Sequence, residues 1–191
     1  NRFFFVTGEA GVGKSVVCKL AAERYKVCLC ARAEKIVESK NANDVWSLDL
    51  KRCLELLTNQ PVLIFIDSLE FIADSLSRLD ILTSIFNTAS SFENVKIICS
   101  CRTSDKNSFL PLIDRIKAKE IEIAPLGKLD LETLEKRFPE LNTRGDETKR
   151  LLSIPFYANI IVTYGQSSFS KKGISFRETI WRNVICLEGR Q

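Results

Sequence analysis

Histidine and methionine are both missing from this chain of 191 residues. Without an imidazole, no mechanism that depends on a histidine base or a histidine metal ligand is open to it. Long apolar runs are missing as well, since none approaches the roughly 18 residues that a membrane-spanning helix needs. The short apolar run at residues 3–6 continues directly into a glycine-rich loop, so we expect neither a signal peptide nor a membrane partner.

The overall composition is that of an ordinary globular domain. Hydrophobic residues make up 45% of the chain and charged residues 27%, with a net charge of +4. A chain of this length holds one α/β domain and part of a second. The mild positive charge suits a nucleotide-binding protein and does not by itself indicate a nucleic-acid partner. Because a core strand is expected directly after Asn1 and Arg2, we expect the chain to be a piece of a longer protein.

The cysteines are odd in number, and most of them fall within expected strands or helices. The seven are Cys18, Cys28, Cys30, Cys53, Cys99, Cys101 and Cys186. Free thiols that act as small buried hydrophobes are typical of a reducing compartment, so we expect a cytoplasmic protein. Two C-x-C pairs, at 28 and 30 and at 99 and 101, each place both sulfurs on one face of a strand. This spacing favours core packing over a metal or redox site, because zinc sites more often use C-x₂₋₄-C loops.

The most specific motif is GEAGVGKS at residues 8–15, a complete G-x-x-x-x-G-K-S loop. The apolar run at residues 3–7 predicts a strand before it, and residues 15–25 predict a helix after it. Strand, glycine-rich loop and helix form the context in which this motif binds phosphates. That context disfavours the alternative, a glycine-rich turn whose lysine merely faces water.

Each residue type in the loop has a chemical role. Gly8 and Gly13 let the backbone turn its N–H groups towards phosphate oxygens at a helix N-terminus. Lys14 is expected to reach the β- and γ-phosphates, and the Ser15 hydroxyl is expected to ligate Mg²⁺. The residues expected to contact the nucleotide are Gly8, Glu9, Ala10, Gly11, Val12, Gly13, Lys14, Ser15 and Val16.

Strands and helices alternate along the first two thirds of the chain. Further strands are predicted at residues 27–31, 62–66, 95–99 and 120–123. Helices are predicted at residues 44–57, with Asp44 as the cap, and at residues 69–86. Strict apolar–polar alternation at residues 120–123 predicts an edge strand. We therefore expect an α/β domain over residues 1–124.

From residue 125 onward the pattern changes to short helices with polar breaks. The candidate helices are residues 129–138, 147–152, 155–164 and 175–187. We expect residues 125–191 to form a small all-helical subdomain.

Three more candidate residues lie at or just after the ends of strands. Asp67 ends LIFID, and its carboxylate is expected to hold the Mg²⁺ hydration shell opposite Ser15, with helix capping as the alternative role. Glu70 is the candidate general base that polarises the attacking water, and a first-turn glutamate favoured by the helix dipole is the alternative. Arg102 is expected to sense the γ-phosphate or to stabilise transition-state charge, and a solvated or ion-paired arginine is the alternative.

Four motifs in sequence order resemble those of the STAND class of signal-transduction ATPases, which are relatives of the AAA+ and NLR-type NTPases. The motifs are GEAGVGKS, LIFIDSLE, IICSCR and LSIPFY, and the resemblance covers most of the chain. In that class the second motif commonly reads D-x-L-D-E; here Asp67 begins D-S-L-E-F. Glu70 falls on the first acid of the second pair and Phe71 replaces the next, a difference that predicts slow hydrolysis.

The resemblance implies a three-layer P-loop NTPase fold with a parallel five-stranded sheet in the order 5-1-4-3-2. It implies that Arg102 closes the sensor strand and that Pro155 lies against the nucleotide, although a proline that simply starts a helix explains Pro155 equally well. ATP, dATP or ADP with Mg²⁺ would hold the α/β and helical parts together, and exchange or hydrolysis would control self-association. Effector and sensor domains would lie outside this chain, and many members of the class serve in immunity or antiviral defence.

Other protein classes share the loop. An AAA+-like ATPase acting on DNA would use a basic cluster near the 175–187 helix, although such clusters are usually a solvated face. That cluster consists of Lys171, Lys172, Arg177 and Arg182. A small-molecule kinase would need an acceptor site and lid arginines, and a nonenzymatic scaffold that kept the loop is the remaining alternative. No N-K-x-D guanine-reading motif is present, so adenine is favoured.

Overall fold

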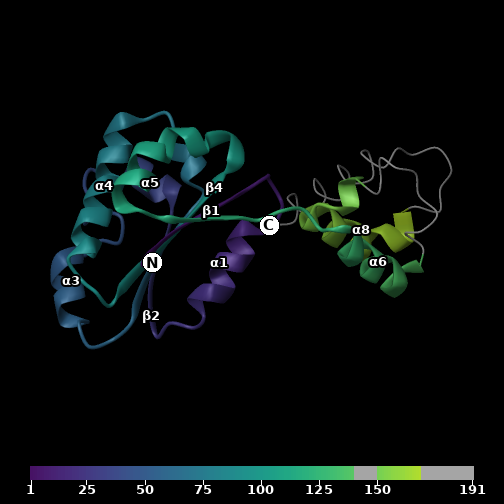
Figure 1. Cartoon of the computed structure of the whole chain (residues 1–191), viewed down its shortest axis with the longest axis horizontal. Coiled ribbons are helices and arrows are strands. Elements are labelled where there is room, and N and C mark those ends of the chain that lie inside the picture. The colour runs from purple at the N-terminus through teal and green to yellow at the C-terminus, as the bar shows by residue number, and fades with distance from the viewer. Residues whose placement is uncertain (140–149, 169–191) are drawn as a thin grey trace. The chain divides into compact units, whose positions relative to one another are not determined.

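The computed structural model describes residues 1–139 and 150–168 of the chain. The chain divides into two compact units, Asn1–Ile123 and Ala124–Gln191, and each is described by itself (Figure 1). Within the described ranges, no helix is both long and apolar enough to cross a membrane.

A five-stranded parallel sheet forms the centre of the first unit. Its strands are β1 (Phe3–Gly8), β2 (Val27–Arg32), β3 (Val62–Asp67), β4 (Val95–Arg102) and β5 (Lys119–Glu122). They lie in the order β2-β3-β4-β1-β5, with every pair parallel. This is the expected order 5-1-4-3-2 counted from the opposite edge, so the P-loop NTPase topology is confirmed.

Burial of the strands follows their places in the sheet. Every residue of β3 is buried, as its continuous apolar sequence predicts for a strand covered on both faces. Every residue of β5 is exposed, and among the described residues the strand has only β1 as a neighbour. The edge position predicted for residues 120–123 is therefore confirmed.

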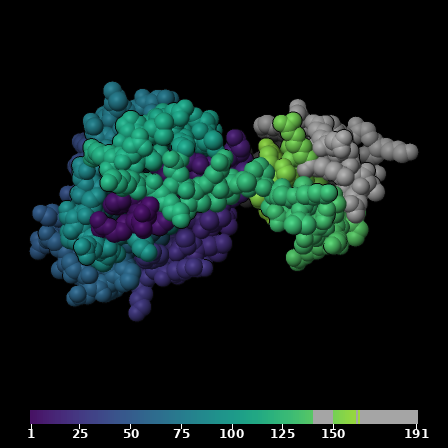
Figure 2. Space-filling model, in the orientation of Figure 1, coloured from purple at the N-terminus to yellow at the C-terminus, as the bar shows by residue number. Residues whose placement is uncertain are grey.

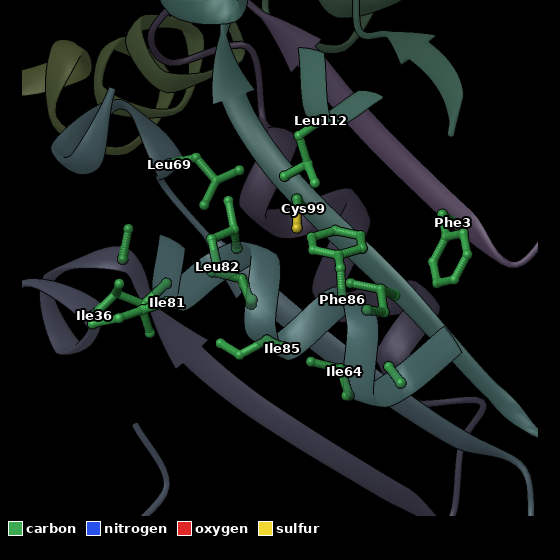
Figure 3. Close-up of a cluster of buried hydrophobic side chains, with 14 of the residues drawn as sticks. Phe3, Ile36, Ile64, Leu69, Ile81, Leu82, Ile85, Phe86, Cys99 and Leu112 are labelled. Carbon is green, nitrogen blue, oxygen red and sulfur yellow. The ribbon is translucent and has the colours of Figure 1, made fainter. Parts of the chain in front are cut away.

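Helices cover the two faces of the sheet unequally. Those of the first unit are α1 (Lys14–Ala22), α2 (Ala33–Glu38), α3 (Leu50–Leu56), α4 (Leu76–Ser90), α5 (Leu110–Ile116) and the 3₁₀ helices η1 (Leu69–Ile72) and η2 (Thr103–Phe109). Side chains from α2, α3, α4 and α5 join one large core with the strands, and α1 lies across the strands from α4 and α5 (Figure 1). In that core Phe86 packs beside Phe3, with ring centroids 5.7 Å apart (Figure 3).

Two helix predictions are wrong in detail. The helix expected from Asp44 begins only at Leu50, where the Asp49 side chain accepts the backbone N–H of Arg52, while Asp44 accepts backbone N–H groups within a preceding turn. The single helix expected at residues 69–86 is divided into η1 and α4, and Ser75 between them is extended. Apolar periodicity continues across this break because both helices face the same core.

The second unit contains helices α6 (Lys128–Arg137) and α8 (Pro155–Ser168), and residues 150–152 are also helical. Leu152 and Ala158 form its small core with apolar side chains of α6. The predicted helices at 129–138 and 155–164 are confirmed. The predicted helix at 175–187, the basic cluster near it and residues 147–149 lie outside the described residues.

Candidate phosphate-binding site

The glycine-rich loop joins the buried end of β1 to the start of α1. Gly8, Gly11 and Gly13 all have positive φ angles, of 155°, 81° and 96°. A Cβ on Gly8 would lie 2.6 Å from the carbonyl oxygen of Ile123, so only glycine fits there. A Cβ on Gly13 would meet nothing within 4 Å, so the space above the end of the loop is open. Successive backbone N–H groups in such a turn form a concave anion-binding nest.

Lys14 lies folded into this loop. Its side chain is buried, and its Nζ donates hydrogen bonds of 2.9 Å to the backbone carbonyls of Gly8 and Glu9. An ammonium group carries three donors, so these bonds use two of them. No carboxylate within the described ranges forms an ion pair with Lys14. The loop therefore holds a buried positive charge whose hydrogen-bond partners are neutral backbone carbonyls, and an anion would complement it.

Ser15 and Asp67 are in contact although they are 52 positions apart in the sequence. Ser15 Oγ donates a 2.9 Å hydrogen bond to Oδ1 of Asp67, which lies buried at the end of β3. Crossover connections place the end of β3 beside the loop after β1, because both strands are parallel neighbours of β4. A hydroxyl and a carboxylate side by side suit Mg²⁺, which takes few protein oxygens and keeps several waters.

Ser100 also contacts Asp67, and it is a site residue that the sequence pattern did not predict. It is buried on β4, and its hydroxyl donates to the same Oδ1 of Asp67. Its Oγ also accepts the backbone N–H of Ser68 at 2.9 Å, where the chain turns with the left-handed φ of 63°. β4 also contains the charged residues Lys96 and Arg102, so no pattern in the sequence singled out Ser100.

Glu70 and Arg102 form an ion pair next to this group. Arg102 Nε lies 3.2 Å from Glu70 Oε1, and the arginine side chain is half-exposed while the glutamate is 14% exposed. The second oxygen, Oε2 of Glu70, is buried without a hydrogen-bond partner. Of the roles left open for Arg102, the structure contains the ion-paired one, and Glu70 also stands in the first turn of η1. A buried oxygen without a partner is free to accept a proton or a water.

The other candidate residues are divided between the two units. Glu9, Ala10 and Gly11 are exposed at the loop tip. Val12 is buried beneath the loop, and Val16 is 61% exposed on α1. Pro155 belongs to the second unit, where it begins α8.

Thiols near the site are held in their neutral form. Burial raises the pKa of Cys18 to about 12, with the negative charge of Asp67 contributing. Burial raises the pKa of Cys101 to about 12 as well, reinforced by the Glu70 carboxylate. Complete burial keeps the pKa of Cys99 well above its ordinary value. Because the thiolate is the reactive form, these cysteines are not nucleophiles at neutral pH.

Neither a protein-family model nor a curated protein matches this chain. Among solved structures it is similar to the Walker-type ATPase PABY2304 of Pyrococcus abyssi, with a TM-score of 0.63, 14% identity, and coverage of 98% of this chain and 68% of that one. It is similar to AMPPCP-bound DnaA from Aquifex aeolicus, with a TM-score of 0.58, 16% identity, and coverage of 87% and 56%. It is also similar to the AAA domain of FIGL-1 in complex with ADP, with a TM-score of 0.52, 18% identity, and coverage of 80% of this chain and 52% of that one.

The chain thus spans about half the length of the DnaA and FIGL-1 chains that it matches. At these identities the likeness is one of fold, and it agrees with the strand order and with the place of the glycine-rich loop between β1 and α1. The chain therefore has the α/β fold of the Walker-type and AAA ATPases.

Proposed function

We propose that this chain is the Mg-ATP-binding, slowly hydrolysing nucleotide switch of a larger STAND-type regulator. The observation that carries the proposal is the contact of Ser15 with Asp67 beneath a glycine loop that encloses the Lys14 ammonium. Backbone N–H groups, a buried cation and a paired hydroxyl and carboxylate are the complement of a polyphosphate with its divalent cation. Nucleotide-bound neighbours of the same fold support this assignment.

Each residue of the site has a defined task in the proposal. The loop and Lys14 bind the phosphates, while Ser15 and Asp67 would hold Mg²⁺, which neutralises phosphate charge when bound. Ser100 keeps the Asp67 carboxylate turned towards Ser15. Glu70 accepts a proton from the attacking water through its carboxylate, and Arg102 senses the γ-phosphate.

Slow turnover is expected for two reasons: the site has one catalytic carboxylate, that of Glu70, and this carboxylate is held in an ion pair with Arg102. Phe71, which is 52% exposed, stands where a second acid would follow Glu70. Oε1 of Glu70 is already paired with Arg102, so the carboxylate must be released before it is fully basic. A site of this kind favours long residence of ATP, which suits a switch better than a motor.

The regulatory part of the proposal rests on the resemblance of the four motifs to the STAND class. Bound ATP, dATP or ADP would set the arrangement of the α/β and helical parts, with Pro155 as a contact from the helical part. The change would control self-association in a longer protein that carries effector and sensor domains, in the cytoplasm and in an immune or antiviral role.

Lys14→Ala tests the binding claim. Loss of a charged hydrogen-bond donor to phosphate is expected to weaken ATP at least about ten-fold, measured by calorimetric titration with MgATP. Lys19→Ala, an exposed lysine of the same helix, is the matched control and is expected to keep the wild-type affinity. Equal ATP affinity in Lys14→Ala and wild type would contradict the proposal.

A second candidate function is an AAA+-like ATPase acting on DNA. It is favoured by the likeness to Aquifex DnaA and to a structure described as a DNA replication initiation factor, with a TM-score of 0.56 and 17% identity. The two candidates separate by ATP turnover with and without duplex DNA. Stimulation by DNA would favour the second candidate, and unchanged turnover favours the switch.

A further inference from the structure

The two faces of the sheet differ in how well they are covered. Along β1 and β4, residues alternate between faces, and Phe5 and Ile97 are fully buried on the side of α4 and α5. Their neighbours Phe4 and Ile98 point to the α1 side and stay only partly buried. Among the described residues, α1 is the helix that supplies a side chain, Cys18, to the small cluster on that side. The α1 side therefore lacks part of the cover that the opposite side has.

A groove of about 290 Å³ lies on this uncovered part. Its floor comes from the strands, including Phe4, Leu63 and Ile98, and its wall is α1. At its margins Val17 of α1 is 44% exposed and Ile121 of β5 is 37% exposed. β5 crosses the surface of the first unit above α1 (Figure 2). A contiguous apolar hollow with a polar rim is typical of an interaction site.

The charges of the rim have one sign. The charged residues that line the groove are Arg24 and Lys96, and both are exposed. Lys119 of β5 pairs in register with Phe4, so it lies on the same face, and it is also exposed. None of these three cations has an ion pair within the described part of the chain. The groove thus offers an apolar floor and unpaired positive charge to an occupant.

These charges discriminate between occupants. A second copy of the chain placed groove to groove would bring like cations together, which is unfavourable. Residues 169–191 carry more basic than acidic side chains, so they do not complement the rim. An occupant with acidic side chains flanking an apolar stripe satisfies both the rim and the floor.

The backbone of the floor indicates a helix rather than a strand. The floor strands β3, β4 and β1 each lie between two other strands of the sheet, so all three already have hydrogen-bonding neighbours on either side. An added segment gains side-chain contacts from this face and no backbone partners. A helix satisfies its own backbone hydrogen bonds and can therefore pack there.

We infer that this groove, between α1 and β5, binds an amphipathic helix with acidic flanks from a partner protein. The contact buries Phe4, Val17, Ile98 and Ile121 in the manner of a helix laid into an apolar groove. Arg24 and Lys96 meet its carboxylates and fix its orientation. The inference goes beyond the proposed function, since none of these residues belongs to the glycine-rich loop or to the contacting set of Ser15, Asp67 and Ser100.

The probes are three synthetic 16-residue peptides, labelled for fluorescence anisotropy with the full chain. The first carries leucines at helical spacing with flanking glutamates, the second has lysine in place of each glutamate, and the third is a scramble of the first. We expect saturable binding of the glutamate peptide, at least ten-fold tighter than either of the others. Equal binding of all three would overturn the inference, because it would show unspecific adhesion.

Variants of the groove locate the binding. Ile121→Glu is expected to weaken the glutamate peptide at least ten-fold, and Leu56→Glu, at an 81% exposed position on α3, is the matched control that leaves it unchanged. The double variant Arg24→Glu with Lys96→Glu is expected to reverse the preference, so that the lysine peptide binds more tightly than the glutamate peptide. Exposed charge changes of this kind spare the fold, which circular dichroism checks. An unreversed preference, or equal loss in Leu56→Glu, would overturn the inference.

Discussion

Arg102 Nε lies 3.2 Å from Glu70 Oε1, at the edge where the glycine-rich loop, the end of β3 and the end of β4 converge. The arginine is half-exposed and the glutamate largely buried, so Arg102 can turn outward while Glu70 stays in place. Under the proposed function the pair links two events, because an arginine drawn to the γ-phosphate leaves Glu70 free to polarise water. A diphosphate offers no γ-phosphate and leaves the pair intact.

The first prediction is that Arg102→Ala reduces the preference for ATP over ADP. Loss of a charge-assisted contact to the γ-phosphate is expected to weaken ATP about ten-fold while ADP affinity stays within about two-fold. Calorimetric titration with each nucleotide measures the ratio. Arg52→Ala, at an exposed position of α3, serves as the control. An unchanged ratio in Arg102→Ala would remove this residue from γ-phosphate sensing.

The second prediction concerns Glu70→Gln, which keeps the shape of the side chain and removes its basicity. Turnover is expected to fall about 100-fold, the usual scale for loss of a general base, with ATP affinity nearly unchanged. Release of inorganic phosphate under saturating MgATP measures this. Glu93→Gln, an exposed glutamate before β4, is the control. Equal turnover in Glu70→Gln and wild type would exclude the role of base.

The third prediction is that Ser100 positions Asp67 for magnesium. Ser100→Ala removes the donor to Asp67 and leaves the Ser68 N–H without its acceptor, so we expect a loss of about 1 kcal/mol in stability and a higher Mg²⁺ concentration for half-maximal turnover. Ser100→Thr keeps the hydroxyl and is expected to restore the wild-type Mg²⁺ requirement. If alanine and threonine shift the requirement equally, Ser100 has only a packing role.

Most of the sheet was predictable because its signals are local. The apolar run of β3 and the alternation in β5 mark a central and an edge strand, and both are found as predicted. The strand order came from the motifs rather than from periodicity, since no pattern within a strand states its neighbour. Asp67 could be placed near Ser15 once the strands were taken as parallel, because the carboxyl ends of parallel strands meet at one edge of a sheet.

What escaped prediction depends on tertiary contacts. The short helix α2 was missed because six residues give too little periodicity, although Ile36 within it is fully buried. Asp44 was a plausible cap by residue type, but Asp49 takes that role where the helix meets the core. The pairing of Glu70 with Arg102 and the contact of Ser100 with Asp67 join residues more than 30 positions apart, and one sequence holds no signal for such pairs.

The fourth prediction ranks two substitutions in the loop. Gly8→Ala combines a positive φ with a clash against the Ile123 carbonyl, whereas Gly13→Ala has the positive φ and open space. Backbone strain alone costs roughly 1–3 kcal/mol, so Gly8→Ala is expected to lower the free energy of unfolding by more than Gly13→Ala does. Urea unfolding measures both. A loss in Gly13→Ala as large as that in Gly8→Ala would contradict the close packing seen at Gly8.

The last prediction concerns alkaline stability. Burial raises the pKa of Cys18 to about 12 from its ordinary value of 9.0. Between these values the unfolded chain loses the thiol proton while the folded chain keeps it, so the free energy of unfolding falls as pH rises above about 9 and is unaffected below. Each such thiol contributes a slope of at most about 1.4 kcal/mol per pH unit. Urea unfolding at pH 8, 9 and 10 in reducing buffer should show a shallower decline in Cys18→Ala than in wild type. Other alkaline groups titrate in both proteins, so the difference between the two slopes isolates Cys18, and identical slopes would show that its thiol is not shielded from water in the folded state.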